Sequence, residues 1–155
     1  MSKRTLVAVF SVFAVVASIG YAATTSLEGV KCLIAASKDA KEDKAAAYKD
    51  GKVFFCCDNC KGKFESASKE DKEKMAPKAN HQLVASKQYE QQACPMSGGK
   101  LDASTAIEVG GTKIAFCCNN CKGAAEKMKP EEQVEKLFGE EAFKKAKFEK
   151  VKATK

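Results

Sequence analysis

The sequence uses one short cysteine motif twice, and this repetition constrains the fold more than any other feature. Residues 55–62 read Phe-Cys-Cys-Asp-Asn-Cys-Lys-Gly, and residues 116–123 repeat them with a single change, Asn119 in place of Asp58. Cys32 precedes the first copy and Cys94 precedes the second at nearly the same spacing. Such self-similarity indicates two tandem copies of one structural unit.

The residues around each motif predict a hairpin followed by helices. Asp50-Gly51 and Gly110-Gly111 predict tight turns, and alternating apolar residues after each turn predict a strand that ends at the cysteines. Apolar residues then recur at helical spacing, so a short helix should begin at or just after the last cysteine of each motif. Ser68 and Pro130 mark the starts of second helical segments, which Pro77 and Gly139 should interrupt.

The predicted fold class is therefore α+β, with two tandem hairpin-plus-helix units. The first unit spans residues 27–85 and the second residues 93–152. Residues 86–92, which are polar and poor in apolar side chains, form the natural linker. Because units of about 60 residues bury little apolar surface, each should need disulfides or a metal ion for stability.

The amino terminus has the features of a secretory signal peptide. Lys3 and Arg4 precede an apolar run from Leu6 to Ile19, and Gly20-Tyr21-Ala22 fits the small-x-small pattern before a cleavage site. We expect residues 1–22 to be removed and the mature protein to be periplasmic or secreted. An uncleaved anchor is the alternative, although the run is shorter than the roughly 20 residues that span a bilayer.

Composition argues against two broad classes of function. The formal net charge is +7, but every basic residue after Arg4 is lysine, and no row of aromatic residues interleaves the lysines. Arginine forks and stacking aromatics are what read and grip nucleic acids, so we expect no nucleic-acid partner. No catalytic triad, paired-carboxylate motif or phosphate-binding glycine loop is visible, so we expect no enzyme.

The cysteines are the candidate functional residues. A Cys-x-x-Cys turn that enters a helix presents two sulfurs beside backbone N–H groups that stabilise thiolates, as in a metal knuckle. Zinc accepts three or four sulfur ligands and Cu(I) two or three, so either ion, or another soft heavy metal, is the predicted cofactor. Because adjacent strand residues point to opposite faces, both members of a vicinal pair should rarely reach one ion. The candidate metal ligands are Cys32, Cys56, Cys57, Cys60, Cys94, Cys117, Cys118 and Cys121.

This order of a single cysteine, a hairpin, Phe-Cys-Cys-x-x-Cys and a helix resembles the YHS/TRASH domains. These are small metal-binding modules with a treble-clef-like, zinc-ribbon-like fold, and they are associated with heavy-metal handling. The second copy is the more similar, because Cys94-Pro95-Met96-Ser97-Gly98 resembles the family's opening turn, whereas the first copy has Cys32-Leu33-Ile34-Ala35-Ala36 there. The resemblance implies the ligand sets Cys32, Cys56, Cys60 and Cys94, Cys117, Cys121.

Two other uses of the cysteines stay open at this point. In an oxidising compartment, four cysteines per unit can form two disulfides, which would give an envelope interaction protein without metal. Cys-x-x-Cys at a helix start also suits thiol–disulfide exchange, although the chain lacks the strand and helix alternation of thioredoxin-like folds. His81, the only histidine, lies outside both motifs and should bond a neighbour rather than a metal ion.

Overall fold

The computed structural model describes residues 25–152, so the signal peptide predicted at residues 1–22 lies outside the described residues. The α+β prediction is confirmed for this part of the chain. Its elements are β1 (Lys41–Tyr48), β2 (Gly51–Phe55), α1 (Asp58–Glu65), α2 (Lys69–Ala85), β3 (Tyr89–Glu90), β4 (Asp102–Val109), β5 (Thr112–Phe116), α3 (Asn119–Glu126), α4 (Pro130–Phe138), α5 (Glu140–Lys145) and β6 (Glu149–Lys150).

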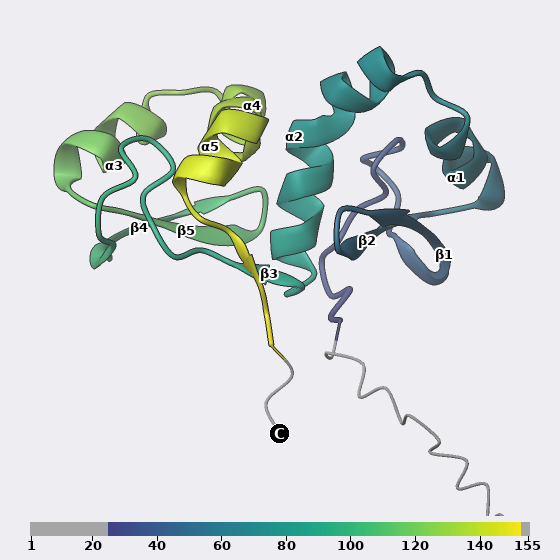
Figure 1. Cartoon of the computed structure of the whole chain (residues 1–155), viewed down its shortest axis with the longest axis horizontal. Coiled ribbons are helices and arrows are strands. Elements are labelled where there is room, and N and C mark those ends of the chain that lie inside the picture. The colour runs from purple at the N-terminus through teal and green to yellow at the C-terminus, as the bar shows by residue number, and fades with distance from the viewer. Residues whose placement is uncertain (1–24, 153–155) are drawn as a thin grey trace, which may run out of the picture.

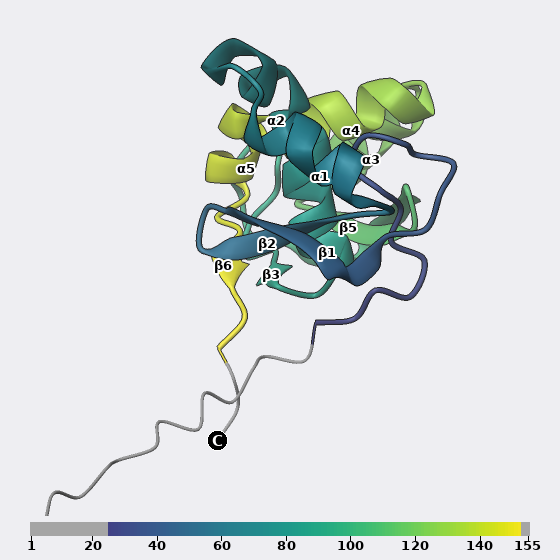
Figure 2. The ribbon, with the colours of Figure 1, turned by 90° about the vertical axis from the view of Figure 1, so that its right-hand side faces the viewer.

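The helices form a layer above the two hairpins, as both views of the ribbon show (Figures 1 and 2). Hairpin β1–β2 belongs to the first unit and hairpin β4–β5 to the second, and both are antiparallel. Helix α2 runs between the hairpins, while α1 and α3 lie at opposite ends of the molecule (Figure 1). The two cysteine motifs, which begin these outer helices, are therefore far from each other.

The hairpin turns differ between the units. Gly110 and Gly111 form the second turn with φ of 55° and 81°, as predicted. The first turn is Lys49-Asp50, with Lys49 at φ 50°, rather than the predicted Asp50-Gly51. Gly51 is instead the first residue of β2, and a Cβ there would lie 2.7 Å from Oε1 of Gln88. Close packing, not the turn, requires this glycine.

Helices α1 and α3 begin earlier than predicted. Each starts directly after the second cysteine of its motif, with Cys57 and Cys118 as the N-cap residues in extended conformation. The third cysteines, Cys60 and Cys121, therefore lie inside the first helical turn. Strands β2 and β5 end directly before the vicinal cysteines. The side chains of these cysteines therefore do not alternate as they would in a strand.

Helix α2 is continuous, and the predicted interruption at Pro77 is wrong. Ser68 caps its start as expected, since its Oγ accepts a hydrogen bond of 3.1 Å from the backbone N–H of Asp71. A proline within a helix costs about 3 kcal/mol, but the residues that follow it here, among them Ala79 and Leu83, are buried and hold the helix in place. In the second unit Gly139 separates α4 from α5, as predicted.

The two units share one interior through α2. Leu83 of this helix belongs to the core of the second unit, whereas Ala79, one turn earlier, belongs to the core of the first. The fully buried Asn80 donates a hydrogen bond of 2.9 Å to the carbonyl oxygen of Phe138, and its Oδ1 accepts one of 3.2 Å from the hydroxyl of Tyr48. Polar and apolar contacts thus join the two units.

The segment predicted as the linker, residues 86–92, packs into this interior. Ser86, Gln88 and Tyr89 are at most 8% exposed. Strand β3 at its centre pairs antiparallel with β6, so this segment is joined to the end of the second unit. No helix within residues 25–152 is long and apolar enough to span a bilayer.

Candidate metal centres

Each unit brings three cysteine sulfur atoms together. The triads are Cys32, Cys56, Cys60 and Cys94, Cys117, Cys121, and within each triad all sulfur atoms lie within 4.8 Å of one another. These are the two ligand sets that the resemblance implies. In both units a loop supplies the first cysteine, the residue directly after a hairpin strand is the second, and the first turn of a helix supplies the third.

The sulfur separations suit coordination of one ion. The Sγ atoms of Cys56 and Cys60 are 3.8 Å apart, and those of Cys117 and Cys121 are 3.7 Å apart. Sulfurs placed about 2.3 Å from a tetrahedral zinc ion are separated by about 3.8 Å. All eight cysteines are free thiols in this structure. The triads can therefore accept a metal ion with little movement.

Burial is graded across each triad. Cys32 and Cys94 are 2% and 0% exposed, whereas Cys56, Cys60 and their counterparts in the second unit are half-buried. An ion in the triad would thus have a protein-covered side at the loop cysteine and a side nearer solvent.

Cys57 and Cys118 lie outside the triads but next to them. Both are exposed, and their Sγ atoms are 3.7 Å from those of Cys56 and Cys117, respectively. The vicinal sulfurs lie close together because the chain turns from strand into helix here, but only one member of each pair, Cys56 or Cys117, belongs to a triad. The pKa of Cys57 is lowered, chiefly by the backbone N–H of Cys60 at the start of α1, and that of Cys118 is lowered in the same way.

The remaining thiols differ strongly in acidity. Burial, with help from neighbouring thiols, raises the pKa of Cys60 and of Cys121 to about 12. Burial also opposes ionisation of Cys94, but hydrogen bonds from the side chain and backbone of Ser97 and from other backbone groups outweigh it and lower its pKa to about 7. One ionised thiol in a triad thus disfavours the ionisation of a second. A bound cation removes this repulsion, so metal binding should release protons and tighten as pH rises.

Two glutamines that the sequence analysis missed hold the cysteine loops in place. Nε2 of Gln82 donates to the carbonyl oxygens of Lys31 and Phe54 at 2.8 and 2.9 Å, and its Oε1 accepts from the backbone N–H of Phe54 at 2.6 Å. The side chain therefore ties the residue before Cys32 to the strand that leads to Cys56.

Gln91 makes the same set of bonds in the second unit. Its Nε2 donates to the carbonyl oxygens of Ala93 and Ala115 at 2.9 and 2.8 Å, and its Oε1 accepts from the N–H of Ala115 at 3.0 Å. Ala93 directly precedes Cys94, just as Lys31 precedes Cys32. We call Gln82 and Gln91 the carboxamide clamps.

The second centre has two further supports. The hydroxyl of Ser97 lies 3.1 Å from Sγ of Cys117, within hydrogen-bond distance. Thr105, 1% exposed, accepts a bond of 2.9 Å from the N–H of Phe116 at the irregular step of the hairpin. In the first unit Ala35, three residues after Cys32 as Ser97 is after Cys94, has no hydroxyl to make such a bond. The second centre is thus more firmly prearranged.

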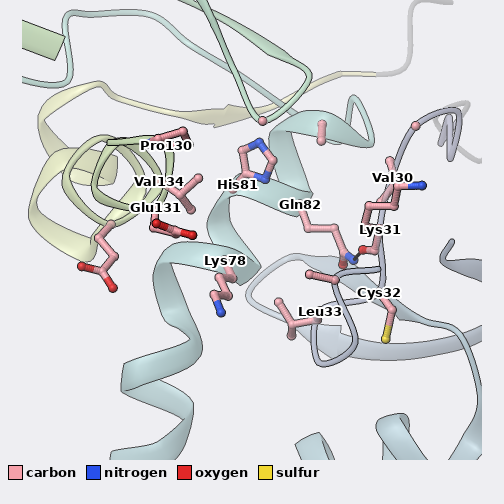
Figure 3. A pocket seen from close by; sticks show the side chains of 15 residues that line it. Val30, Lys31, Cys32, Leu33, Lys78, His81, Gln82, Pro130, Glu131 and Val134 are labelled. Carbon is pink, nitrogen blue, oxygen red and sulfur yellow. Dashed lines mark hydrogen bonds between the residues drawn. The ribbon is translucent and has the colours of Figure 1, made fainter. Parts of the chain in front are cut away.

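A pocket of about 380 Å³ lies beside α2, and Cys32 is the one triad residue that lines it. The segment from Gly29 to Ala36, the second hairpin turn and the start of α4 complete its walls, and the side chain of Cys32 points away from the other labelled residues (Figure 3). His81 in this wall lies 3.1 Å from both the carbonyl oxygen of Val109 and the hydroxyl of Thr112. The histidine contacts neighbouring residues and belongs to neither triad, as expected.

Comparison of the chain with models of protein families, with curated proteins and with solved structures finds no match. The resemblance to YHS/TRASH domains therefore rests on the cysteine pattern and stays a prediction. The function has to be argued from the geometry of the two centres.

Proposed function

We propose that this protein is an exported metal-binding protein that holds one thiophilic ion, zinc or Cu(I), in each of its two cysteine triads. One observation carries the proposal. The same three-sulfur arrangement, with a buried loop cysteine and two half-buried partners, forms in two units at opposite ends of the molecule.

The same geometry favours a metal over disulfides. A disulfide joins two sulfurs at about 2.05 Å, whereas here a cluster of three lies at metal-ligand spacing, with a fourth beside it. Pairing within a triad leaves one sulfur over, so two disulfides per unit would have to include the outer Cys57 or Cys118. One ion accommodates all three at once, and it supplies the stability that units of this size need.

The role that follows is binding rather than catalysis: sequestration, trafficking or metal-dependent stabilisation in the periplasm or outside the cell. Thiolate ligands select soft ions, which fits the heavy-metal handling associated with YHS/TRASH domains. The metal ion is then the principal partner, with no nucleic acid and no stable membrane insertion.

Native mass spectrometry on anaerobically purified protein tests the proposal. The expected result is two metal ions per chain, with zinc or Cu(I) preferred over Mg²⁺ or Ca²⁺. A fully disulfide-bonded chain that takes up no metal after reduction would refute it and support the disulfide-stapled alternative. The same spectra test export, since protein from the native host should begin at Ala23 or within a residue or two of it.

Thiol–disulfide exchange is a second candidate, and one observation favours it. Cys57 is exposed with a lowered pKa, while Cys60, three residues later in the Cys-x-x-Cys turn, has a pKa raised to about 12. An attacking thiol and a resolving thiol differ in this way in exchange proteins. Catalytic reduction of a model disulfide by the metal-free protein would support this candidate, and stoichiometric reaction alone would argue against it.

A further inference from the structure

We infer that Cys57 and Cys118 are transfer ligands. Each forms, with the cysteine that precedes it, an outer two-sulfur binding site through which a metal ion enters and leaves the triad. This inference rests on the proposed metal-binding function and adds the route by which the ion is exchanged.

The position of Cys57 relative to the triad is the first argument. Its sulfur lies 3.7 Å from that of Cys56, about the separation of two thiolates on one zinc ion, yet Cys57 is not part of the mutually close triad. Cys56 thus belongs to two sets of sulfurs, an inner one that includes the buried Cys32 and an outer one that includes the exposed Cys57. An ion can pass between the sets without leaving Cys56.

Access is the second argument. Cys32 is 2% exposed, so an outside ligand cannot approach an ion from that side. Cys57 is the exposed cysteine of this unit, and its sulfur lies at the solvent edge of the centre. The first sulfur that an arriving ion meets is therefore that of Cys57.

Repetition is the third argument. Cys118 is the exposed cysteine of the second unit, and its sulfur lies 3.7 Å from that of Cys117. Both N-cap residues have nearly the same backbone, with φ of −160° and −165° and ψ of 166°. An accidental surface thiol would not be expected to recur with the same geometry beside both centres.

The exchange is a ligand substitution without a redox change. Metal–sulfur bonds to Cys57, Cys56 and then Cys60 form one at a time, each as a bond between the ion and a thiolate of the donor breaks, and the proton of each protein thiol passes to the departing thiolate. The bond from the ion to Cys57 is then replaced by one to Cys32, whose proton returns to Cys57. Release runs through the same steps in reverse.

Metal-release kinetics test the inference on zinc-loaded protein kept free of oxygen. The test variant combines Cys57→Ser with Cys118→Ser, and serine is a favoured N-cap residue that leaves the helix starts intact. The matched control combines Cys60→Ser with Cys121→Ser, which removes one triad sulfur from each centre. Bound zinc is counted by native mass spectrometry, and release to a chromophoric chelator is followed by stopped flow.

The test variant should keep two zinc ions but release them about tenfold more slowly, because a ligand held beside the ion acts at high effective concentration. A small thiol at roughly millimolar concentration should restore the rate, since it replaces the missing sulfur. The control should lose zinc at equilibrium. Unchanged release by the test variant, or loss of a zinc ion from it, would overturn the inference. Failure of the unmodified protein to bind either zinc or Cu(I) would overturn the proposed function itself.

Discussion

The carboxamide clamp of the first unit allows a quantitative test of how its metal centre is held. Gln82 is 3% exposed and makes three hydrogen bonds, one to the carbonyl oxygen of Lys31 and two to the backbone of Phe54. In Gln82→Leu the buried N–H of Phe54 loses its partner, which costs about 1–3 kcal/mol. Loss of the two bonds to carbonyls adds about 1 kcal/mol each.

A decrease of about 3–5 kcal/mol in the free energy of unfolding of the metal-free protein is therefore expected. Metal affinity of the first centre should fall as well, because the loop that carries Cys32 is no longer tied to the strand that leads to Cys56. Loss of a residue that orients a ligand typically weakens metal binding by about 10–100-fold. The second centre, held by Gln91, should keep its affinity.

Gln88→Leu is a matched control for this experiment. Gln88 also makes three hydrogen bonds of 2.7 Å with its side chain, two of them to the backbone of Lys52 on the same strand, β2. Lys52 lies near the hairpin turn rather than near the cysteines. This variant should therefore lose similar stability while the first centre keeps its affinity.

Denaturant unfolding of the metal-free variants and chelator competition on the loaded ones separate the two effects. If Gln82→Leu and Gln88→Leu weaken the first centre equally, general destabilisation explains the loss, and the clamp has no specific role. The reasoning also fails if Gln82→Leu leaves metal affinity unchanged.

Three further outcomes are expected. Cys121→Ser should lower thermal stability more than Cys60→Ser, and it should release metal at a lower chelator concentration, because the second centre is better prearranged. Equal losses from the two substitutions would contradict this. In metal-free protein, alkylation monitored by peptide mass mapping should modify Cys57 and Cys118 first. Their rates should level off at a lower pH than the rate of an unstructured thiol, because the folded-state pKa of each is lowered, and slower modification than at Cys60 or Cys121 would disagree. Pro77→Ala should stabilise the protein by up to about 3 kcal/mol in denaturant unfolding, because alanine can donate its backbone N–H to the continuous helix. A loss of stability would instead show that the proline ring makes stabilising contacts.

The parts of the fold that depend on neighbouring residues could be predicted from the sequence. The hairpins, the Ser68 cap and the break at Gly139 follow from short patterns, and the structure confirms them. Two cysteines of each triad lie four residues apart where strand passes into helix, whereas the complete triads, with Cys32 and Cys94 far upstream, are the ligand sets that the resemblance implies.

The features that depend on distant contacts could not be predicted in this way. Pro77 remains helical because α2 is packed from both sides, which no local pattern reveals. Gln82 and Gln91 perform the same task from different places, one on a helix and one in a loop, so the repeat does not align them. The closeness of Cys56 and Cys57 depends on the residue at which the strand ends, and a shift of one residue would have changed it.

Helix α2 contributes to both hydrophobic cores, and this has a consequence for a molecule that carries only one ion. Opening either half exposes α2, so the halves should melt in one cooperative transition. The free energy of binding at one centre then adds to the stability of the whole chain. If the proposed function holds, a half-loaded molecule should keep its vacant triad folded and bind a second ion without the cost of refolding.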